Sequence, residues 1–317
     1  MRGMIVAAGL GTRLQPLTRH RAKPALPIRG IPLIAYPLAF LARAGVTEVV
    51  INVHHLPDSL IGAARRWCPA ELELRFSHEP ELLHTGGALR RVAGFLRESD
   101  PCVVLGGDMI LDLDLAEVIR RHREERHAAT LVLLEGDPRA ARFGTIGVDG
   151  VGRVRRIGRR FDLGGAERAG IYTWANLFSR SAIESLPDRE TFNHLDDWLA
   201  PLLESGAEDI RGVVLSPTEC AWEPVGTLAE YLEVNLHPPA LSYLDPDAVA
   251  REDGARIQGN CIIGRGAAIG RGALLTRAVV WDGETVPDGF AGEDGVYAGG
   301  AFHPCVAMPG AEGEARG

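Results

Sequence analysis

The sequence predicts an α/β fold, in which a mostly parallel mixed sheet is covered by helices on both faces and followed by a short β-helix. Two observations lead to this prediction. Up to Leu134, apolar runs of strand length alternate with segments of helical periodicity, which is typical of parallel sheets. Near the C-terminal end, apolar residues recur every six positions, and this period is typical of stacked coils of short strands.

The first elements follow from short apolar runs. Residues 4–8, MIVAA, predict a buried strand, and the loop Gly9–Gly11 follows it. A helix that ends near Gly45 is predicted from apolar residues at helical spacing, namely Ile31, Ile34, Leu38 and Leu41. Polar residues directly after such strands are candidates for a site, because sites in parallel sheets lie at the carboxyl ends of strands.

The same alternation continues through residue 134. Strands are predicted at residues 48–53, 71–76, 101–108 and 129–134. Helices are predicted over residues 57–68, from Thr85 or Gly86 onward, and around Leu115, Val118 and Ile119. The strand that runs into Asp108 places this carboxylate at the same sheet edge as the loop at Gly9–Thr12.

The remainder divides into three parts. Residues 150–235 are predicted to continue the α/β domain with a strand at 169–178 and a helix over 190–206. Pro238–Pro239 mark a linker after it. The six-residue repeat consists of Ile257, Ile263, Ile269, Leu275 and Trp281. We therefore expect one domain over 1–237, a short β-helix over 245–304 and a disordered tail over 309–317.

Composition excludes several classes of protein. The chain has 317 residues and a net charge of -8, so nucleic acid and anionic membranes are poor partners. It has no apolar run of about 20 residues, which a membrane-spanning helix would need. The apolar stretch near its first residues is too short for a secretory signal. The chain has five scattered cysteines, namely Cys68, Cys102, Cys220, Cys261 and Cys305. Their number and spacing favour free thiols in a reducing cytoplasm over disulfides or a zinc site.

The basic residues point to a phosphate ligand. Residues 1–47 contain seven basic residues and no acidic one, and Lys23 is the only lysine of a chain that otherwise uses 33 arginines. Glycines at 9 and 11 can turn backbone amides toward phosphate oxygens. The planar guanidinium of Arg13 can bind two phosphate oxygens, and the ammonium of Lys23 offers a compact point charge.

Two familiar phosphate motifs do not fit. Gly9 is not followed by the GK[ST] of a Walker A loop, and Leu14 stands where a dinucleotide fingerprint needs its third glycine. A dinucleotide-dependent oxidoreductase is therefore disfavoured. His54, His55 and His84 lack a matching ligand set at metal spacing.

The stretch AAGLGTRLQPLT followed by AKPALPI resembles the signature of the sugar-1-phosphate nucleotidyltransferases. Further similar segments are INVHHLPDSL, HTGGAL, LGGDM, ERAGIY and WEPVGTLAEYL, so the resemblance covers nearly the whole chain. It implies a Rossmann-like nucleotidyltransferase domain followed by a short left-handed β-helix. It also implies that a sugar 1-phosphate attacks the α-phosphorus of a nucleoside triphosphate and releases pyrophosphate.

The resemblance implies a role for each matching residue. Catalysis falls to Arg13, at the leaving pyrophosphate, and to Lys23, between the α-phosphate and the sugar phosphate. The nucleotide-binding residues are Ala8, Gly9, Gly11, Thr12, Gly86 and Gly87. The sugar-binding residues are Gly144, Gly170 and Arg160. Asp108 is expected to bind Mg²⁺, with Glu223 as the candidate second carboxylate.

The chain departs from the family pattern at three places. Pro224 stands where the second acidic residue is expected, and the adjacent Glu223 points to the opposite face of a regular strand. Arg159 and Arg160 replace a Glu-Lys pair, which removes an acceptor for sugar hydroxyls. Ala22 replaces the proline that usually precedes the lysine.

These features predict a cytoplasmic, Mg²⁺-dependent enzyme that makes a nucleotide sugar, with GTP and mannose 1-phosphate as the leading substrate pair. UTP or dTTP with glucose 1-phosphate or an amino-sugar 1-phosphate is the alternative. Pro224 and Arg159 also leave open a non-catalytic regulatory homologue that binds nucleotide sugars. The β-helix suggests a homo-oligomer contact or a cover for the domain. Arg19 and Arg21 are expected to be solvated, and Trp222 is expected to be a packing residue.

Overall fold

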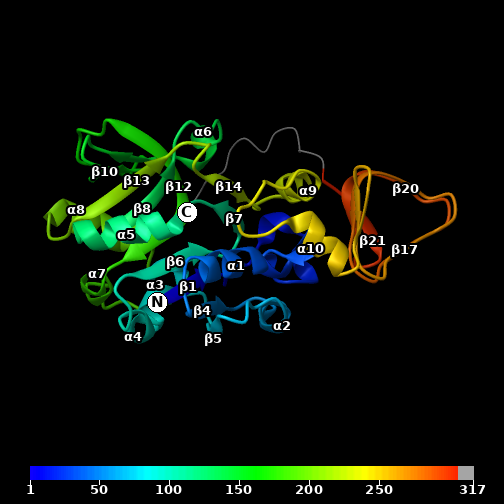
Figure 1. Ribbon diagram of the computed structural model, residues 1–317, viewed down its shortest axis with the longest axis horizontal. Helices are drawn as coiled ribbons and strands as arrows, with labels where there is room; N and C mark the ends of the chain where they lie inside the picture. The colour runs from blue at the N-terminus through cyan, green and yellow to red at the C-terminus, as the bar shows by residue number, and fades with distance from the viewer. Residues whose placement is uncertain (306–317) are drawn as a thin grey trace.

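The computed structural model describes residues 1–305 (Figure 1). The predicted tail at 309–317 lies outside these residues. Four parallel strands in the order β5-β4-β1-β6 form one half of the main sheet. Their bounds are Arg2–Val6 for β1, Glu48–Val53 for β4, Glu73–His78 for β5 and Cys102–Gly106 for β6. Met4 of β1 lies between Val50 and Val104, so the first strand is central.

A long antiparallel strand joins this half to the rest of the sheet. β12 (Arg168–Phe178) pairs with β6 on one side and β8 (Ala129–Leu134) on the other, and β8 continues in parallel to β13 (Ile210–Leu215). Six of these seven strands therefore run in one direction, which confirms the predicted mixed, mostly parallel sheet. Three short antiparallel strands extend from the first half of β12, namely β9 (Ile146–Val148), β10 (Val154–Ile157) and β11 (Phe161–Asp162).

Helices cover both faces of the sheet. Alternate residues of β1 enter different apolar clusters, Ile5 on one face and Met4 on the other, as the two-residue period of a strand requires. The face of Ile5 is covered by α1 (Ala35–Arg43), α2 (Pro57–Arg66) and α5 (Leu115–Glu125). The face of Met4 is covered by α3 (His84–Arg91), α4 (Ala93–Leu96), α7 (Arg180–Glu184) and α8 (Ala200–Ser205).

Two predicted helices have different bounds. The helix expected from Ile31 begins only at Ala35, because Ile31–Pro32 (β3) instead forms a small hairpin with Pro27–Ile28 (β2). The helix expected over 190–206 is a loop through His194, one π-type turn at Leu195–Leu199 (η4) and then α8. The Asn193 side chain accepts the Leu195 backbone N–H at 2.8 Å, which starts the turn at this point.

The C-terminal section contains parallel strands stacked at a regular offset. β16, β18 and β20 pair in order, and residues 17 positions apart lie side by side, as Ile262, Val279 and Val296 do. The bounds of its strands are Arg256–Gln258 (β15), Cys261–Ile263 (β16), Ala268–Ile269 (β17), Leu274–Val280 (β18), Thr285–Val286 (β19), Ala291–Ala298 (β20) and Ala301–Pro304 (β21). β17 pairs with β19 at the same offset.

The five positions of the predicted repeat are not equivalent. Ile257 lies in β15, which is antiparallel to β16, and Ile269 is 37% exposed, whereas Ile263 and Trp281 are buried. The flanking strand β21 is also antiparallel to its neighbour. The hexapeptide β-helix therefore stays a prediction.

The C-terminal strands lie at one end of the molecule beside α9 (Leu228–Leu236) and α10 (Pro246–Glu252) (Figure 1). Ile262, Val279 and Val296 share an apolar cluster with Tyr231 and Leu232 of α9. Their strand neighbours face the other way, into a separate cluster within the C-terminal section. The section is therefore packed against the main sheet domain through α9. In residues 1–305 no helix has both the length and the apolar character needed to cross a membrane.

Candidate active site

The loop after β1 folds back on the segment that carries the lysine. Gly11 has a φ of +63° and precedes the short turn Thr12–Leu14 (η1). A Cβ on Gly11 would lie 2.9 Å from Thr18 Cγ2 and 3.0 Å from Lys23 Cβ, so both the dihedral and the space require glycine. Thr18 Oγ1 donates to the Gly11 carbonyl at 2.9 Å, which closes the loop.

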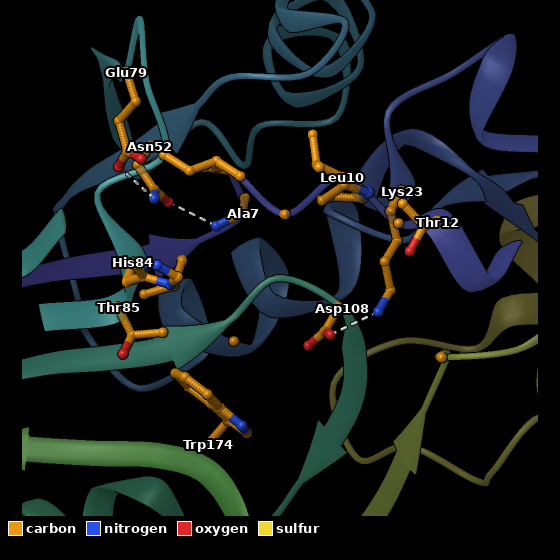
Figure 2. A pocket seen from close by; sticks show the side chains of 18 of the residues that line it. Ala7, Leu10, Thr12, Lys23, Asn52, Glu79, His84, Thr85, Asp108 and Trp174 are labelled. Atoms are coloured by element: carbon orange, nitrogen blue, oxygen red, sulfur yellow. Dashed lines mark hydrogen bonds and ion pairs between the residues drawn. The ribbon is translucent and has the colours of Figure 1, made fainter. Parts of the chain in front are cut away.

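A cavity of about 460 Å³ lies at the carboxyl ends of β1, β4 and β6 (Figure 2). The structure brings seven of the predicted site residues to its walls, namely Ala8, Gly9, Gly11, Thr12, Arg13, Lys23 and Asp108. These residues come from two separate parts of the sequence and meet because β1 and β6 are neighbours in the sheet. This is the location expected for a site in a parallel sheet.

Lys23 and Asp108 form an ion pair across this cavity. Lys23 Nζ lies 2.7 Å from Asp108 Oδ2 (Figure 2), and the side chains are 10% and 49% exposed. Asp108 reaches this position because the chain after β6 passes tightly over β1. A Cβ on Gly107 would lie 2.9 Å from Ile5 Cγ2. The pair combines a confined cation with a carboxylate that is open to the cavity.

Arg13 lies at the start of α9. Its Nη2 would lie 3.3 Å from a Cβ built on Gly226, so the glycine leaves room for the guanidinium. The Gly226 backbone N–H donates to Glu230 Oε2 at 2.7 Å, and Thr227 caps the helix by accepting the Glu230 backbone N–H at 3.2 Å. The VGT segment therefore places a helix N-terminus beside Arg13.

Gly86 and Gly87 are not among the residues that line the cavity. A Cβ on Gly86 would lie 2.2 Å from the Phe192 ring, and one on Gly87 would lie 2.1 Å from the Glu190 carbonyl oxygen. The Gly86 backbone N–H donates to the Phe192 carbonyl at 2.8 Å. These glycines are thus needed for close packing of α3 on residues 190–192, and His84 and Thr85 face the cavity instead.

The three predicted sugar-binding residues are also not among the residues that line this cavity. A Cβ on Gly170 would lie 2.9 Å from the Leu134 backbone, so this glycine permits close pairing of β12 with β8. Gly144 ends the short helix α6 (Ala140–Phe143) with a φ of +74°. The Arg160 side chain is 76% exposed and lies 3.4 Å from Asp196 Oδ2.

Glu223 is held away from the cavity by an arginine. It lies on β14 (Ala221–Pro224), and its Oε2 is 2.8 Å from Arg139 Nη1. Arg139 also contacts Asp137 at 2.7 Å and keeps the pKa of that carboxyl below its usual range by hydrogen bonding. A divalent cation would have to compete with this guanidinium, so the prediction of Glu223 as a metal ligand has no support from its contacts.

The donor set at the cavity suits Mg²⁺ with one protein carboxylate. Pro224 pairs with Met109 in the β14–β7 ladder (β7, Met109–Asp112), and the Val225 N–H donates to the Asp108 carbonyl at 3.0 Å. Position 224 is therefore adjacent to Asp108 but supplies no side-chain oxygen. Asp108 alone is half exposed toward the cavity, and Mg²⁺ is commonly held by one or two carboxylates plus substrate phosphates and water.

A buried polar pair that the sequence patterns did not predict lies at the other end of the cavity. Asn52 Oδ1 accepts the Ala7 N–H at 2.6 Å, and Asn52 Nδ2 donates to Glu79 Oε1 at 2.8 Å (Figure 2). Glu79 is 2% exposed and also accepts the Leu83 N–H. The signal that could have revealed this pair is the single asparagine in the largely apolar strand β4, whose sequence is EVVINV.

Trp174 is a second residue that the sequence did not reveal. It lines the cavity between Thr85 and Asp108 (Figure 2) and has a φ of +63° where the β12–β8 register shifts. Its ring lies 4.8 Å from that of His194, which bonds Thr85 Oγ1 at 2.7 Å. Burial lowers the pKa of His194 to about 3, so this histidine is neutral under the wall of the cavity.

A glycine loop, a confined cation and a strand-end carboxylate thus meet at one edge of the sheet, and comparison with known proteins shows the family. The sequence profile of the Nucleotidyl transferase family matches residues 2–239. The chain therefore belongs to the nucleotidyl transferase family of enzymes. The predicted resemblance to sugar-1-phosphate nucleotidyltransferases, and within them to mannose-1-phosphate guanylyltransferases, is confirmed.

Individual relatives agree with this placement. A mannose-1-phosphate guanylyltransferase of Mycobacterium tuberculosis is 31% identical over 83% of this chain and 75% of its own length. A UTP–glucose-1-phosphate uridylyltransferase of Synechocystis is 25% identical over 83% and 74%. The crystal structure of HddC from Yersinia pseudotuberculosis complexed with GMP-PN has a TM-score of 0.59 at 23% identity, covering 73% of this chain and 96% of that one, which is a likeness of fold.

Proposed function

We propose that this enzyme transfers a nucleoside monophosphate from GTP to mannose 1-phosphate. The observation that carries the proposal is the Lys23–Asp108 pair at the mouth of a glycine loop. In this reaction a phosphate oxygen of the sugar 1-phosphate forms a bond to the α-phosphorus. The bond from the α-phosphorus to the bridging oxygen breaks, and pyrophosphate leaves with that electron pair.

The chain's own groups suit charge neutralisation, which such transfers need more than covalent chemistry. Backbone amides of Gly9, Gly11 and Thr12 would hold the triphosphate, and Arg13 would stabilise the departing pyrophosphate. Lys23 would release Asp108 and place its ammonium between the two reacting phosphates. Asp108 would hold Mg²⁺, which when bound supplies positive charge to the phosphate oxygens.

The choice of base and sugar rests on likeness to relatives. The Mycobacterium tuberculosis relative supports GTP with mannose 1-phosphate. The Synechocystis relative, similar over the same share of the chain, supports UTP with glucose 1-phosphate as the alternative. Gly144, Gly170 and Arg160 remain proposed sugar contacts, although they are not among the residues that line the cavity.

A second candidate is a regulatory homologue that binds a nucleotide sugar without turnover. Pro224 favours it, because the second carboxylate is missing beside Asp108.

The deciding experiment measures pyrophosphate release with Mg²⁺ for GTP, UTP and dTTP, each with mannose, glucose and amino-sugar 1-phosphates. The proposal expects fastest release with GTP and mannose 1-phosphate. Fastest release with another pair would reassign the substrates. Absence of turnover with every pair, alongside measurable binding of a nucleotide sugar, would establish the regulatory reading.

The C-terminal section and the setting of the enzyme complete the proposal. The 17-residue stacking of parallel strands supports a short left-handed β-helix, and its packing on α9 supports a role as a cover for the domain. This section would also form the contact of a homo-oligomer, and light scattering measures the mass of the protein in solution. All five cysteines are free thiols, four of them buried, which supports a reducing compartment such as the cytoplasm.

A further inference from the structure

The C-terminal section reaches the segment that carries Lys23. Trp281, directly after β18, is 3% exposed. Its indole Nε1 donates to Tyr231 Oη at 2.9 Å, and the Tyr231 hydroxyl donates to the Pro27 carbonyl at 2.6 Å. These two bonds fix the plane of the indole ring and link it to α9 and to the chain just after the lysine.

Two consecutive residues of the N-terminal segment pack on this indole. The Arg21 guanidinium carbon lies 4.7 Å from the centre of the Trp281 ring, within the range of a cation–π contact. The His20 ring meets it edge-on at 6.4 Å and 89°. Gly299, at the turn between β20 and β21, closes over the other side of His20, where a Cβ would lie 2.4 Å from the imidazole.

Arg21 was expected to be a solvated surface residue. It is only partly exposed and, within residues 1–305, its guanidinium has no carboxylate within ion-pair distance. Its side chain instead packs on the Trp281 ring.

The chain from Ala22 to Leu26 forms a tight, buried turn. The Ala22 N–H donates to Ser59 Oγ at 3.1 Å, and Ala22 is 2% exposed. The Ala25 N–H then donates to the Ala22 carbonyl at 2.8 Å, and the Leu26 N–H to the Lys23 carbonyl at 3.1 Å. Arg21 directly precedes this tight turn, which carries Lys23.

We propose that Trp281 is a positioning residue for Lys23, so that the C-terminal section, which lies outside the matched family region of residues 2–239, completes the active site. The inference rests on the proposed function. A misplacement of about 1 Å of a catalytic group can lower the rate about 100-fold. We therefore expect loss of the Trp281 contact to lower kcat by about 10- to 100-fold.

The test compares Trp281→Leu, Trp281→Phe and Arg21→Met with Leu274→Ser as the control. Leu274 is 71% exposed on the same section and contacts no site residue. Trp281→Leu should lower kcat, and Trp281→Phe should recover most of it, because the phenyl face still receives Arg21. Arg21→Met should lower kcat while leaving the C-terminal core intact, and the Trp281→Leu/Arg21→Met double variant should be no slower than the slower single variant.

Amide hydrogen exchange supplies a readout that does not depend on turnover. Trp281→Leu and Arg21→Met should each raise exchange in residues 20–26 and leave α5 unchanged. Wild-type kcat and wild-type protection of residues 20–26 in both variants would overturn the inference. Trp281→Phe as slow as Trp281→Leu would also overturn it, since the aromatic face would then be irrelevant. If the wild-type enzyme itself turns over no substrate pair, the proposed function fails, and the exchange experiment still tests the coupling.

Discussion

The Lys23 ammonium lies 2.7 Å from the Asp108 carboxylate, although the two residues are 85 positions apart in the chain. The lysine is confined and the carboxylate is half exposed. A cation in so narrow a position interacts with one phosphate oxygen at a time, whereas a guanidinium would spread over a wider plane.

Lys23→Arg should therefore lower kcat although it keeps the charge. We expect a loss of about 100-fold, the usual cost of removing one preorganised charge-stabilising donor. Lys23→Met should lose at least as much. The check is pyrophosphate release at saturating substrates, with Arg19→Lys as a matched control on an exposed residue outside the cavity. Full activity in Lys23→Arg would contradict the claim that this position requires the compact charge of an ammonium group.

Pro224→Asp should tighten the Mg²⁺ dependence. The new carboxylate would stand beside Asp108, since the Val225 N–H already bonds the Asp108 carbonyl. We expect the Mg²⁺ concentration for half-maximal activity to fall about tenfold, which corresponds to about 1.4 kcal/mol. Pro224→Asn controls for loss of the proline ring. Equal Mg²⁺ dependence in the Asp and Asn variants would mean that Asp108 and the substrate phosphates suffice.

Substitutions of Trp174 should affect substrate binding and the stability of the fold differently. Its positive φ costs about 1–3 kcal/mol in a bulky residue, and glycine removes that strain. Trp174→Gly should thus be at least as stable as Trp174→Ala, while both raise KM about tenfold because the cavity loses an aromatic wall. Trp174→Phe should keep most of the affinity. Chemical denaturation and steady-state kinetics measure the two effects, and unchanged KM in Trp174→Gly would remove Trp174 from the site.

Gly86→Ala should destabilise the fold. The added methyl group would lie 2.2 Å from the Phe192 ring, and overpacking of this kind typically costs about 1–3 kcal/mol. Gly94→Ala is the matched control, because it lies in the short helix α4 with nothing within 4 Å of the new methyl group, and it should be neutral or stabilising. Equal free energies of unfolding for the two variants would contradict the packing role assigned to Gly86.

Two buried histidines should make stability fall in mild acid. Burial lowers the pKa of His122 to about 4 and that of His194 to about 3. In the unfolded chain both bind protons below about pH 6.5, so the unfolded state then carries more protons than the folded state. The free energy of unfolding should drop from about pH 6.5 to about pH 4, by up to about 1.4 kcal/mol per pH unit for each histidine.

The variant that tests this pH effect is His194→Gln. It should reduce the slope of the free energy of unfolding against pH by up to the contribution of one histidine. His78→Gln, at an exposed position, should leave the slope unchanged. Urea denaturation at several pH values gives both slopes, and identical slopes for His194→Gln and wild type would contradict a neutral buried His194.

The sequence indicated much of the fold because its signals are local. Apolar runs of strand length located β1, β4, β6 and β8, and helical spacing located α2 and α5. The helix expected over 190–206 begins only at Leu195, where the Asn193 side chain accepts the backbone N–H groups of Leu195 and Asp196. Apolar spacing does not record such capping contacts.

The sequence by itself determined one wall of the cavity: the glycine loop, Arg13, the single lysine and the strand-end Asp108. These residues are specified by motif and by their place after a strand. Only the tertiary structure decided the rest. It turned Glu223 toward Arg139, assigned Gly86 to packing, brought Trp174 to the cavity wall and placed Trp281 on Arg21. Each of these outcomes depends on contacts between segments far apart in the chain, and no local pattern of residues encodes which side of a strand or loop will meet them.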